Sequence, residues 1–287
     1  MTRILKGAEV ASAIYTQLTD RVAALQARGV VPCLAIVRVG ARDDDVAYES
    51  SVAKRCESLG VRALRVTLPG DASQSALLKA IDKINRDASV HACLPLRPLP
   101  ARFDDAAVRN ALSPEKDADG MTDASLLSTF IGAGTGYPPC TPRACMELLS
   151  YYGVPLSGRR AVVVGRSLVV GKPLAMMLLA ENATVTVCHS KTERLPAICR
   201  EANVLVVAVG RAGVVKADCF ASGQTVIDVG FHMDADGRPF GDVDCGAAES
   251  LVDAISPVPG GVGAVTTAVL VRHVVMAAEA GLLGARG

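Results

Sequence analysis

A glycine-rich turn at residues 165–173 carries the residue types that phosphate binding needs. It reads GRSLVVGKP directly after an apolar run, with Gly165, Ser167, Gly171 and Pro173 as its fixed points. Glycines let a chain leave a strand, turn tightly and bring the free N–H groups of a helix start against a phosphate. Ser167 occupies the place of the middle glycine in the dinucleotide fingerprint. Taken alone, the pattern also fits an ordinary glycine-rich strand-to-helix turn.

The segment CHSKTER, residues 188–194, bears on which dinucleotide would bind. An acidic residue about 20 positions beyond the turn would bond the adenosine ribose and select NAD. This chain has Ser190, Lys191 and Arg194 there instead, and Arg166 adds a cation in the turn itself. Hydroxyl and basic groups suit a 2′-phosphate, so the sequence favours NADP over NAD. The alternative is a solvated basic loop without a ligand.

The segment DDDVAYESSVAKRCESLG, residues 43–60, is typical of a capped helix and offers Tyr48 and Lys54 as candidate site residues. Residues four apart share a helix face, whereas a two-residue step turns about 200°. Tyr48 therefore shares its face with Val52, and Lys54, two residues further on, points away. A solvated surface lysine is the ordinary interpretation of Lys54.

The elements that would position these residues alternate between short apolar runs and helical stretches. This rhythm predicts α/β architecture with parallel sheets covered by helices, that is, two three-layer domains of which the second is Rossmann-like. Helices are expected at 45–59 and 73–87. The predicted strands are 33–40, 62–69 and 91–96, followed after Gly158 by 159–165, 183–190, 203–210 and 225–231.

Composition excludes several classes of protein. With 30 basic and 29 acidic residues the net charge is +1, so the chain lacks the electrostatic footprint of a nucleic-acid or membrane-surface protein. The most apolar stretch, residues 264–283, contains Arg272, His273 and Glu279 and is not expected to span a membrane. The nine cysteines form no CxxC pair, and no metal site is expected. We expect a soluble, cytoplasmic protein.

Several motifs occur in one order along the chain. They are PEKDADGM (114–121), PPCTP (138–142), GRSLVVGKP (165–173), VTVCHSKT (185–192), VIDVGF (226–231), GDVD (241–244) and SPVPGGVGAVTTAVL (256–270). With them the chain resembles the methylenetetrahydrofolate dehydrogenase/cyclohydrolase family, usually called FolD in bacteria. The resemblance implies oxidation of 5,10-methylenetetrahydrofolate with NADP and hydrolysis of the methenyl product to 10-formyltetrahydrofolate. It also implies a folate-binding catalytic domain (1–140 plus 270–287), an NADP-binding domain (141–269), a cleft between them, and a homodimer.

The resemblance also implies roles for individual residues. Tyr48 falls on the tyrosine that stacks against the aminobenzoyl ring of folate, and Asp119 on the aspartate that grips the pterin. A carboxylate can accept two N–H bonds from an aminopyrimidine edge, which fixes its orientation. The cofactor positions are Gly165, Arg166, Ser167, Gly171, Ser190 and Phe231, and the closing loop of the substrate site has Pro259, Gly260 and Gly261.

The chain departs from the family at the positions that handle protons. The family's Y-x-x-x-K lysine falls on Val52 when CESLG sets the register, and its glutamine partner falls on Leu96, with Arg97 one place later. Both positions are part of the implied substrate site. Asp45 takes a serine position, and Ala264-Val265 replaces Pro-Met. Losing a general acid–base group costs typically about 10²–10⁴-fold in rate. Hydride transfer itself requires no protein acid or base, because the cofactor does the chemistry.

We therefore expect an NADP-dependent methylenetetrahydrofolate dehydrogenase whose cyclohydrolase activity is weak or lost. Three alternatives stay open. The first is a conventional bifunctional enzyme, and the second is a divergent paralogue acting on another one-carbon imine or aminal. The third is a non-catalytic module that binds folate or NADPH.

Overall fold

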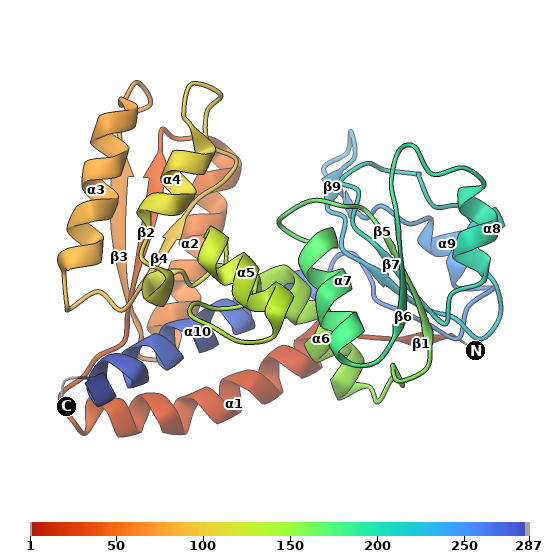
Figure 1. Ribbon diagram of the computed structural model, residues 1–287, viewed down its shortest axis with the longest axis horizontal. Helices are drawn as coiled ribbons and strands as arrows, with labels where there is room; N and C mark the ends of the chain where they lie inside the picture. The colour runs from red at the N-terminus through yellow and green to blue at the C-terminus, as the bar shows by residue number, and fades with distance from the viewer. Residues whose placement is uncertain (1, 285–287) are drawn as a thin grey trace. The chain divides into compact units, whose positions relative to one another are not determined.

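The chain divides into two compact units in the computed structural model, which describes residues 2–284. Among these residues, the three-stranded unit comprises 13–138 with 268–284, and the six-stranded unit comprises 2–12 with 139–267. Two long helices, α1 (Gly7–Gln26) and α10 (Val262–Gly284), contain residues of both units without a break. Figure 1 shows these helices at the two ends of the colour scale.

The sheet of the three-stranded unit is built around β2 (Cys33–Val39). This strand pairs in parallel with β3 (Arg62–Leu68) on one side and with β4 (Ala92–Pro95) on the other. Six of its seven residues are buried, which fits a parallel strand covered on both faces. Its sequence, CLAIVRV, is accordingly apolar nearly throughout.

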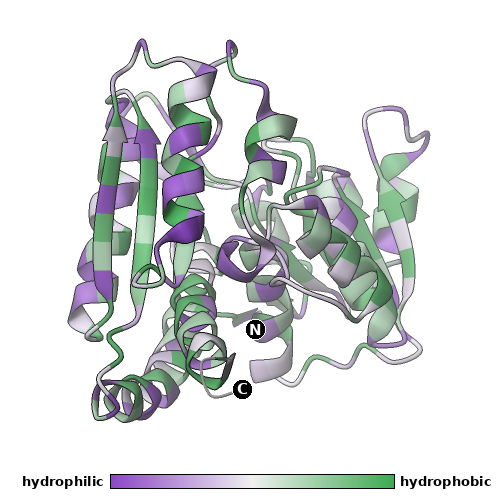
Figure 2. Cartoon of the chain, turned by 60° about the vertical axis from the view of Figure 1, so that its left-hand side comes forward, coloured by the Kyte–Doolittle hydropathy of each residue, from purple (hydrophilic) through white to green (hydrophobic). Residues whose placement is uncertain are grey.

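Helices cover both faces of this sheet. Alternate residues of β2, such as Cys33 and Val37, pack in one cluster with α3 (Gln74–Arg86) and α4 (Asp105–Ala111). The intervening side chains point to the opposite face, and α2 (Asp43–Ser58), which contributes no residue to that cluster, packs against β2 and β3. The helices of this unit carry both hydrophilic and hydrophobic residues, so that each can turn an apolar side to its sheet (Figure 2). The unit therefore has three layers.

Two shorter helical elements follow β4 and α4 in the same unit. They are the 3₁₀ helix η1 (Pro114–Lys116) and α5 (Asp123–Ile131). Side-chain caps fix where the helices begin, because the Asp104 carboxylate accepts the N–H of Ala107 at 3.0 Å and the Thr122 hydroxyl that of Ser125 at 3.1 Å.

The six-stranded unit has a parallel sheet in the order β1-β11-β8-β7-β5-β6. Val162, Leu205 and Val226 share one face with α8 and α9, while α7 packs against β5 and β6 and against α6. The strands are β1 (Arg3–Ile4), β5 (Arg160–Val164), β6 (Thr184–Cys188), β7 (Val204–Val207), β8 (Thr225–Asp228), β11 (Ala254–Ile255) and the antiparallel pair β9 (His232–Met233) and β10 (Pro239–Phe240). The helices are α6 (Cys140–Tyr151), α7 (Gly171–Ala180), α8 (Leu195–Arg200), η2 (Ala217–Cys219) and α9 (Cys245–Ala248).

The predicted α/β fold is confirmed, and each of the seven predicted strands is present within two or three residues of its expected bounds. The expected domain boundaries at 140/141 and 269/270 lie two residues earlier, at 138/139 and 267/268, and one segment differs more. The sequence assigned residues 1–140 to the first domain, whereas residues 2–12 lie in the six-stranded unit. The reason is the short strand β1, in which Arg3 and Ile4 pair with Ala254 and Ile255 at the edge of the large sheet.

Helix α10 is long and apolar enough to cross a membrane by length and composition, over Val262–Leu283. Within the molecule, however, 61% of that stretch is buried. A buried helix that lies in a protein core satisfies the same criterion. Its hydropathy is therefore weak support for a membrane span.

Candidate functional site

The glycine-rich turn joins β5 to α7, as the sequence predicted, and its geometry leaves no room for side chains at two positions. Gly165 has a φ of +131°, and a Cβ there would lie 2.2 Å from the carbonyl oxygen of Ala208. A Cβ on Gly171 would lie 2.1 Å from the carbonyl oxygen of Gly165. The hydroxyl of Ser167 accepts the N–H of Val170 at 3.0 Å and so closes the turn. The result is a close-packed turn at the start of a ten-residue helix, as phosphate binding requires.

Charged and hydroxyl side chains occur in this turn and in the loop after β6, and the two segments meet where the N–H of Gly165 donates to the carbonyl of Cys188 at 2.9 Å. Arg166 and Ser167 are exposed, and so are Ser190, Lys191 and Arg194 in the loop after β6. The imidazole Nδ1 of His189 accepts the N–H of Lys191 at 3.2 Å, which holds the loop together from within. These exposed groups are the right chemistry for a nucleotide phosphate.

A pocket of about 240 Å³ lies beside the end of β8. Phe231, which is 65% exposed, lines one side, and Pro259, Gly260 and Gly261 line another. The structure thus brings together a predicted cofactor residue and the predicted closing loop. The loop is also held from the N-terminus, because the N–H of Gly7 donates to the carbonyl of Gly260 at 2.7 Å.

Two buried aspartates, Asp228 and Asp242, hold the backbone near this pocket through hydrogen bonds. The Asp228 carboxylate accepts backbone N–H groups from Gly230, Asp242 and Val243, each at 3.0 Å. Burial raises the pKa of Asp228 to about 6, although these three donors oppose the rise. Asp242 in turn accepts the N–H of Val209 at 2.7 Å and pairs with His232 Nε2 at 2.7 Å.

This packing explains two further glycines of the motifs VIDVGF and GDVD. A Cβ on Gly230 would lie 2.4 Å from the Asp242 carboxylate, and one on Gly241 would lie 1.8 Å from an oxygen of Asp228. The two aspartates therefore hold the backbone at Gly230 in place, next to Phe231. The sequence contained a signal for this, because Asp228 ends a buried apolar strand and Asp242 stands in a Gly-Asp turn.

In the three-stranded unit, α2 presents the tyrosine and buries the residue one turn later. Tyr48 is 41% exposed, Val52 is fully buried, and Lys54 is exposed. Three aspartates in the first turn favour this helix through its macrodipole, and Asp45 pairs with Arg42 at 2.7 Å. Val52, on which the resemblance places the family lysine, thus belongs to the apolar side of the helix.

A buried ion pair fixes the rotation of α2 about its axis. Glu49 is only 4% exposed and pairs with Arg38 of β2, while Arg65 of β3 lies 3.5 Å from its second carboxylate oxygen. Glu49, Val52 and Cys56 together define the buried side of the helix. Tyr48 precedes Glu49 by one residue and lies at the edge of that side. No local sequence pattern distinguishes Glu49 from the exposed polar residues of this helix.

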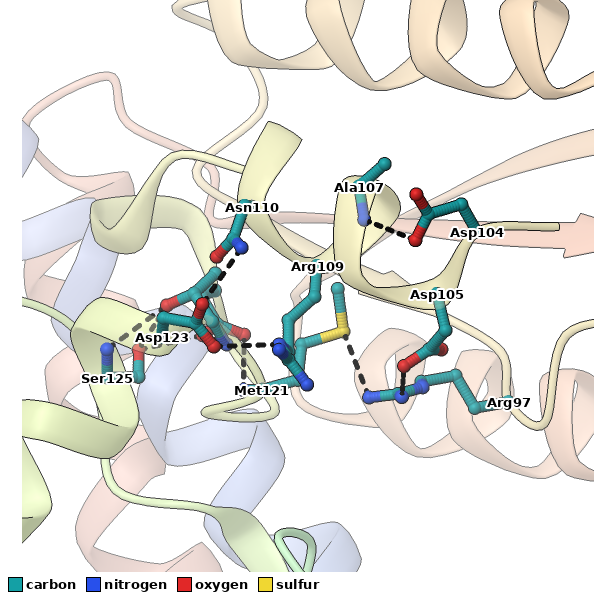
Figure 3. A network of polar contacts seen from close by, with 11 residues as sticks. Arg97, Asp104, Asp105, Ala107, Arg109, Asn110, Met121, Asp123 and Ser125 are labelled. Carbon is teal, nitrogen blue, oxygen red and sulfur yellow. Dashed lines mark hydrogen bonds and ion pairs between the residues drawn. The ribbon is translucent and has the colours of Figure 1, made fainter.

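Leu96 and Arg97 follow the carboxyl end of β4. Leu96 is 6% exposed, and its N–H donates to the carbonyl of Val37 at 2.8 Å. The guanidinium of Arg97 pairs with Asp105 at the start of α4 and reaches the sulfur of Met121 at 3.9 Å (Figure 3). Arg97 is therefore held by a carboxylate, and Leu96, on which the resemblance places the family glutamine, is aliphatic and buried.

The segment that contains Asp119 is held by its neighbour Asp117. Asp117 is fully buried, and its carboxylate accepts the N–H groups of Met121 at 3.0 Å and Thr122 at 2.7 Å. It also accepts the hydroxyl of Ser125 at 2.7 Å. Asp119 is partly buried. The first aspartate of KDADG is thus structural, because its carboxylate holds the backbone that follows Asp119.

Comparison with known proteins identifies the family. A model described as the catalytic domain of tetrahydrofolate dehydrogenase/cyclohydrolase matches residues 5–119, and one described as its NAD(P)-binding domain matches residues 139–282. The chain belongs to the tetrahydrofolate dehydrogenase/cyclohydrolase family. This membership confirms the resemblance stated from the sequence motifs.

Relatives agree with this family in sequence and in structure. The bifunctional protein FolD of Carboxydothermus hydrogenoformans is 52% identical over 281 residues, which are 97% of this chain and 98% of that protein. The crystal structure of the bifunctional FolD from Campylobacter jejuni has a TM-score of 0.95 at 35% identity, with 98% of this chain and 99% of that one covered. The Trypanosoma brucei dehydrogenase-cyclohydrolase, complexed with NADP cofactor and inhibitor, has a TM-score of 0.93 at 34% identity, with 98% of both chains covered.

The names of the Campylobacter and Trypanosoma enzymes carry both a dehydrogenase and a cyclohydrolase activity. They support two activities for this family and do not themselves support a lost cyclohydrolase. Among residues 2–284 of this FolD-family chain, no group of three or more histidine, cysteine or acidic residues is arranged to hold a metal ion.

Proposed function

We propose that this protein is a methylenetetrahydrofolate dehydrogenase that uses NADP. The observation that carries the proposal is the turn at Gly165 and Gly171, where added side chains would collide with the backbone. Such a turn at a helix start, beside exposed Arg166, Ser190 and Arg194, has the donors and the cationic charge for a phosphorylated dinucleotide. The chain belongs to a family in which two relatives of known structure carry this activity in their names.

The chemistry asks little of the protein beyond binding and orientation. Bound NADP supplies the acceptor for a hydride from the methylene carbon, which is oxidised by two electrons to the methenyl cation. Tyr48 stacks against the aminobenzoyl ring, and Asp119 accepts N–H groups of the pterin edge. Phe231 and the loop of Pro259, Gly260 and Gly261 border the nicotinamide and limit the access of water. No side chain has to gain or lose a proton in the hydride step.

We propose further that hydrolysis of the methenyl cation is weak in this protein. Val52 and Leu96 stand where the family resemblance implies a lysine and its glutamine partner, and both are buried aliphatic side chains. Neither can donate or accept a proton. Arg97 is the nearest cation in sequence, but a guanidinium is effectively always charged and already pairs with Asp105.

A bifunctional enzyme is the second candidate, and the names of the relatives favour it. One experiment separates the candidates. Reduction of NADP by methylenetetrahydrofolate and disappearance of methenyltetrahydrofolate are measured on the same preparation, with NAD as the cofactor control. Turnover with NADP and hydrolysis near the spontaneous rate support the proposal. Fast hydrolysis identifies a bifunctional enzyme.

Two other outcomes of that experiment identify the remaining alternatives. Tight binding of folate and NADPH without turnover would indicate a binding module. Cofactor binding without activity on methylenetetrahydrofolate would indicate a paralogue with another one-carbon substrate.

A homodimer and a cytoplasmic location complete the proposal. The family resemblance implies a dimer through the cofactor domain, and β6 lies at the edge of the six-stranded sheet with Val187 38% exposed. Light scattering of the purified protein, with a mass of two chains expected, tests the dimer.

A further inference from the structure

His273 is a buried polar residue of α10 that the proposed chemistry does not use. His273 is only 2% exposed, and its Nδ1 lies 2.8 Å from the carbonyl oxygen of Ala118. A carbonyl oxygen only accepts, so the proton of this hydrogen bond is on Nδ1. The imidazole also stacks on Tyr137, with ring centroids 5.0 Å apart and planes at 23°.

The carbonyl that His273 holds belongs to the peptide unit that leads into Asp119. The oxygen of Ala118 and the N–H of Asp119 share one rigid plane. A bond to this oxygen therefore limits the rotation of the backbone from which the Asp119 side chain projects. Ala118 itself is fully buried, so its carbonyl depends on a partner inside the protein.

The opposite side of the same loop is held by Asp117, whose carboxylate accepts the N–H groups of Met121 and Thr122. Asp119 thus lies between two anchors. One is local, and the other comes from α10, more than 150 residues further along the chain. A carboxylate that must accept two parallel N–H bonds gains from such restraint, since small errors in orientation weaken both bonds.

We propose that His273 is a positioning residue for substrate binding, because its Nδ1–H orients the peptide that carries Asp119. This inference rests on the proposed function, in which Asp119 grips the pterin. His273 acts only through the backbone and touches no substrate. A histidine that merely fills the core would give the same burial and the same ring stacking, so the two roles must be separated by substitution.

Two substitutions divide the properties of the imidazole. His273→Asn keeps an amide N–H close to the place of Nδ1–H but loses the ring. His273→Phe keeps a ring for Tyr137 but loses the donor. Tyr137→Leu is the matched control, because it removes the stacking partner and leaves the hydrogen bond to Ala118 in place.

The measurements are the KM for methylenetetrahydrofolate, the KM for NADP and kcat, with the melting temperature as a check on folding. We expect His273→Phe to raise the folate KM about tenfold, the scale of one lost buried hydrogen bond. His273→Asn and Tyr137→Leu should stay within about threefold of the unaltered protein, and the KM for NADP should not move in any of them.

Equal folate KM values for His273→Phe and the unaltered protein would overturn the inference. So would an equal loss in the Asn and Phe variants, because the ring and not the donor would then matter. Calorimetric binding of tetrahydrofolate separates this failure from that of the proposed function. An unaltered protein that does not bind tetrahydrofolate overturns both, whereas equal binding by His273→Phe overturns only the role of His273.

Discussion

Restoring the missing lysine and glutamine should restore hydrolysis of the methenyl cation. The double variant Val52→Lys with Leu96→Gln places an amine one turn from Tyr48 and an amide within the stretch after β4. The family resemblance implies that these two groups contact each other. A general acid–base group of this kind contributes about 10²–10⁴-fold in rate. We therefore expect hydrolysis by the double variant to exceed that by the unaltered protein at least about a hundredfold.

The burial of both positions sets the stability cost. Val52 is fully buried, and an unpaired ammonium there should destabilise the fold by about 3–5 kcal/mol. Leu96 is 6% exposed, and an amide without a partner there costs about 1–3 kcal/mol. A charged hydrogen bond between the two contributes about 1.5–3 kcal/mol. The double variant should therefore be more stable than the sum of the two single variants by about 2 kcal/mol.

The assay follows the loss of methenyltetrahydrofolate by absorbance, and urea unfolding gives the free energies of the single and double variants. Val52→Leu is a matched control, since it adds volume without a charge. The reasoning is refuted if the unaltered protein already hydrolyses the cation as fast as the double variant. Strictly additive destabilisation would show that the two positions do not meet.

Three further perturbations test other parts of the structure. Gly165→Ala should abolish NADP binding measured by fluorescence titration and lower the melting temperature, because the new Cβ meets the carbonyl of Ala208 at 2.2 Å. Unchanged affinity would contradict the assigned turn. Arg166→Ala should raise the KM for NADP about tenfold or more and leave that for NAD unchanged, since a charged hydrogen bond to the 2′-phosphate is lost; equal effects on both would argue against this contact. Asp228→Asn is tested by measuring the free energy of unfolding as a function of pH. Burial raises the folded-state pKa of Asp228 from 3.8 to about 6. The folded state therefore holds this proton longer, and stability falls as pH rises from about 4 to 6. Relative to the variant, the unaltered protein should lose about 3 kcal/mol of unfolding free energy across that window. A gain would mean that the three N–H donors outweigh burial.

The sheets were predictable because parallel strands covered on both faces consist of apolar residues. Stretches such as 160–164 and 204–207 are short, rich in valine and followed within three residues by a glycine, so each could be recognised by itself. The two-residue strands β1 and β11 gave no such signal. Their pairing depends on residues about 250 positions apart, which no local pattern reports, and this is why the sequence alone does not predict that residues 2–12 pack with the six-stranded unit.

The residues of the candidate site also divide into those that a local pattern predicts and those that it does not. Gly165, Gly171 and the basic loop were found because a phosphate turn needs particular residues at particular spacings. Glu49 and His273 were missed because a buried polar side chain has no periodicity. Its partner is set by the fold, as Arg38 is for Glu49, and Ala118 for His273.

Neither unit of this protein is a continuous piece of chain. The last part of α10 returns to complete the unit that begins at Ala13, and the first strand belongs with residues 139–267. Cutting the gene at the junction near residue 138 would therefore separate each half from residues it needs. We expect neither fragment to become ordered when it is produced alone, because each lacks a segment of its own unit that the other carries.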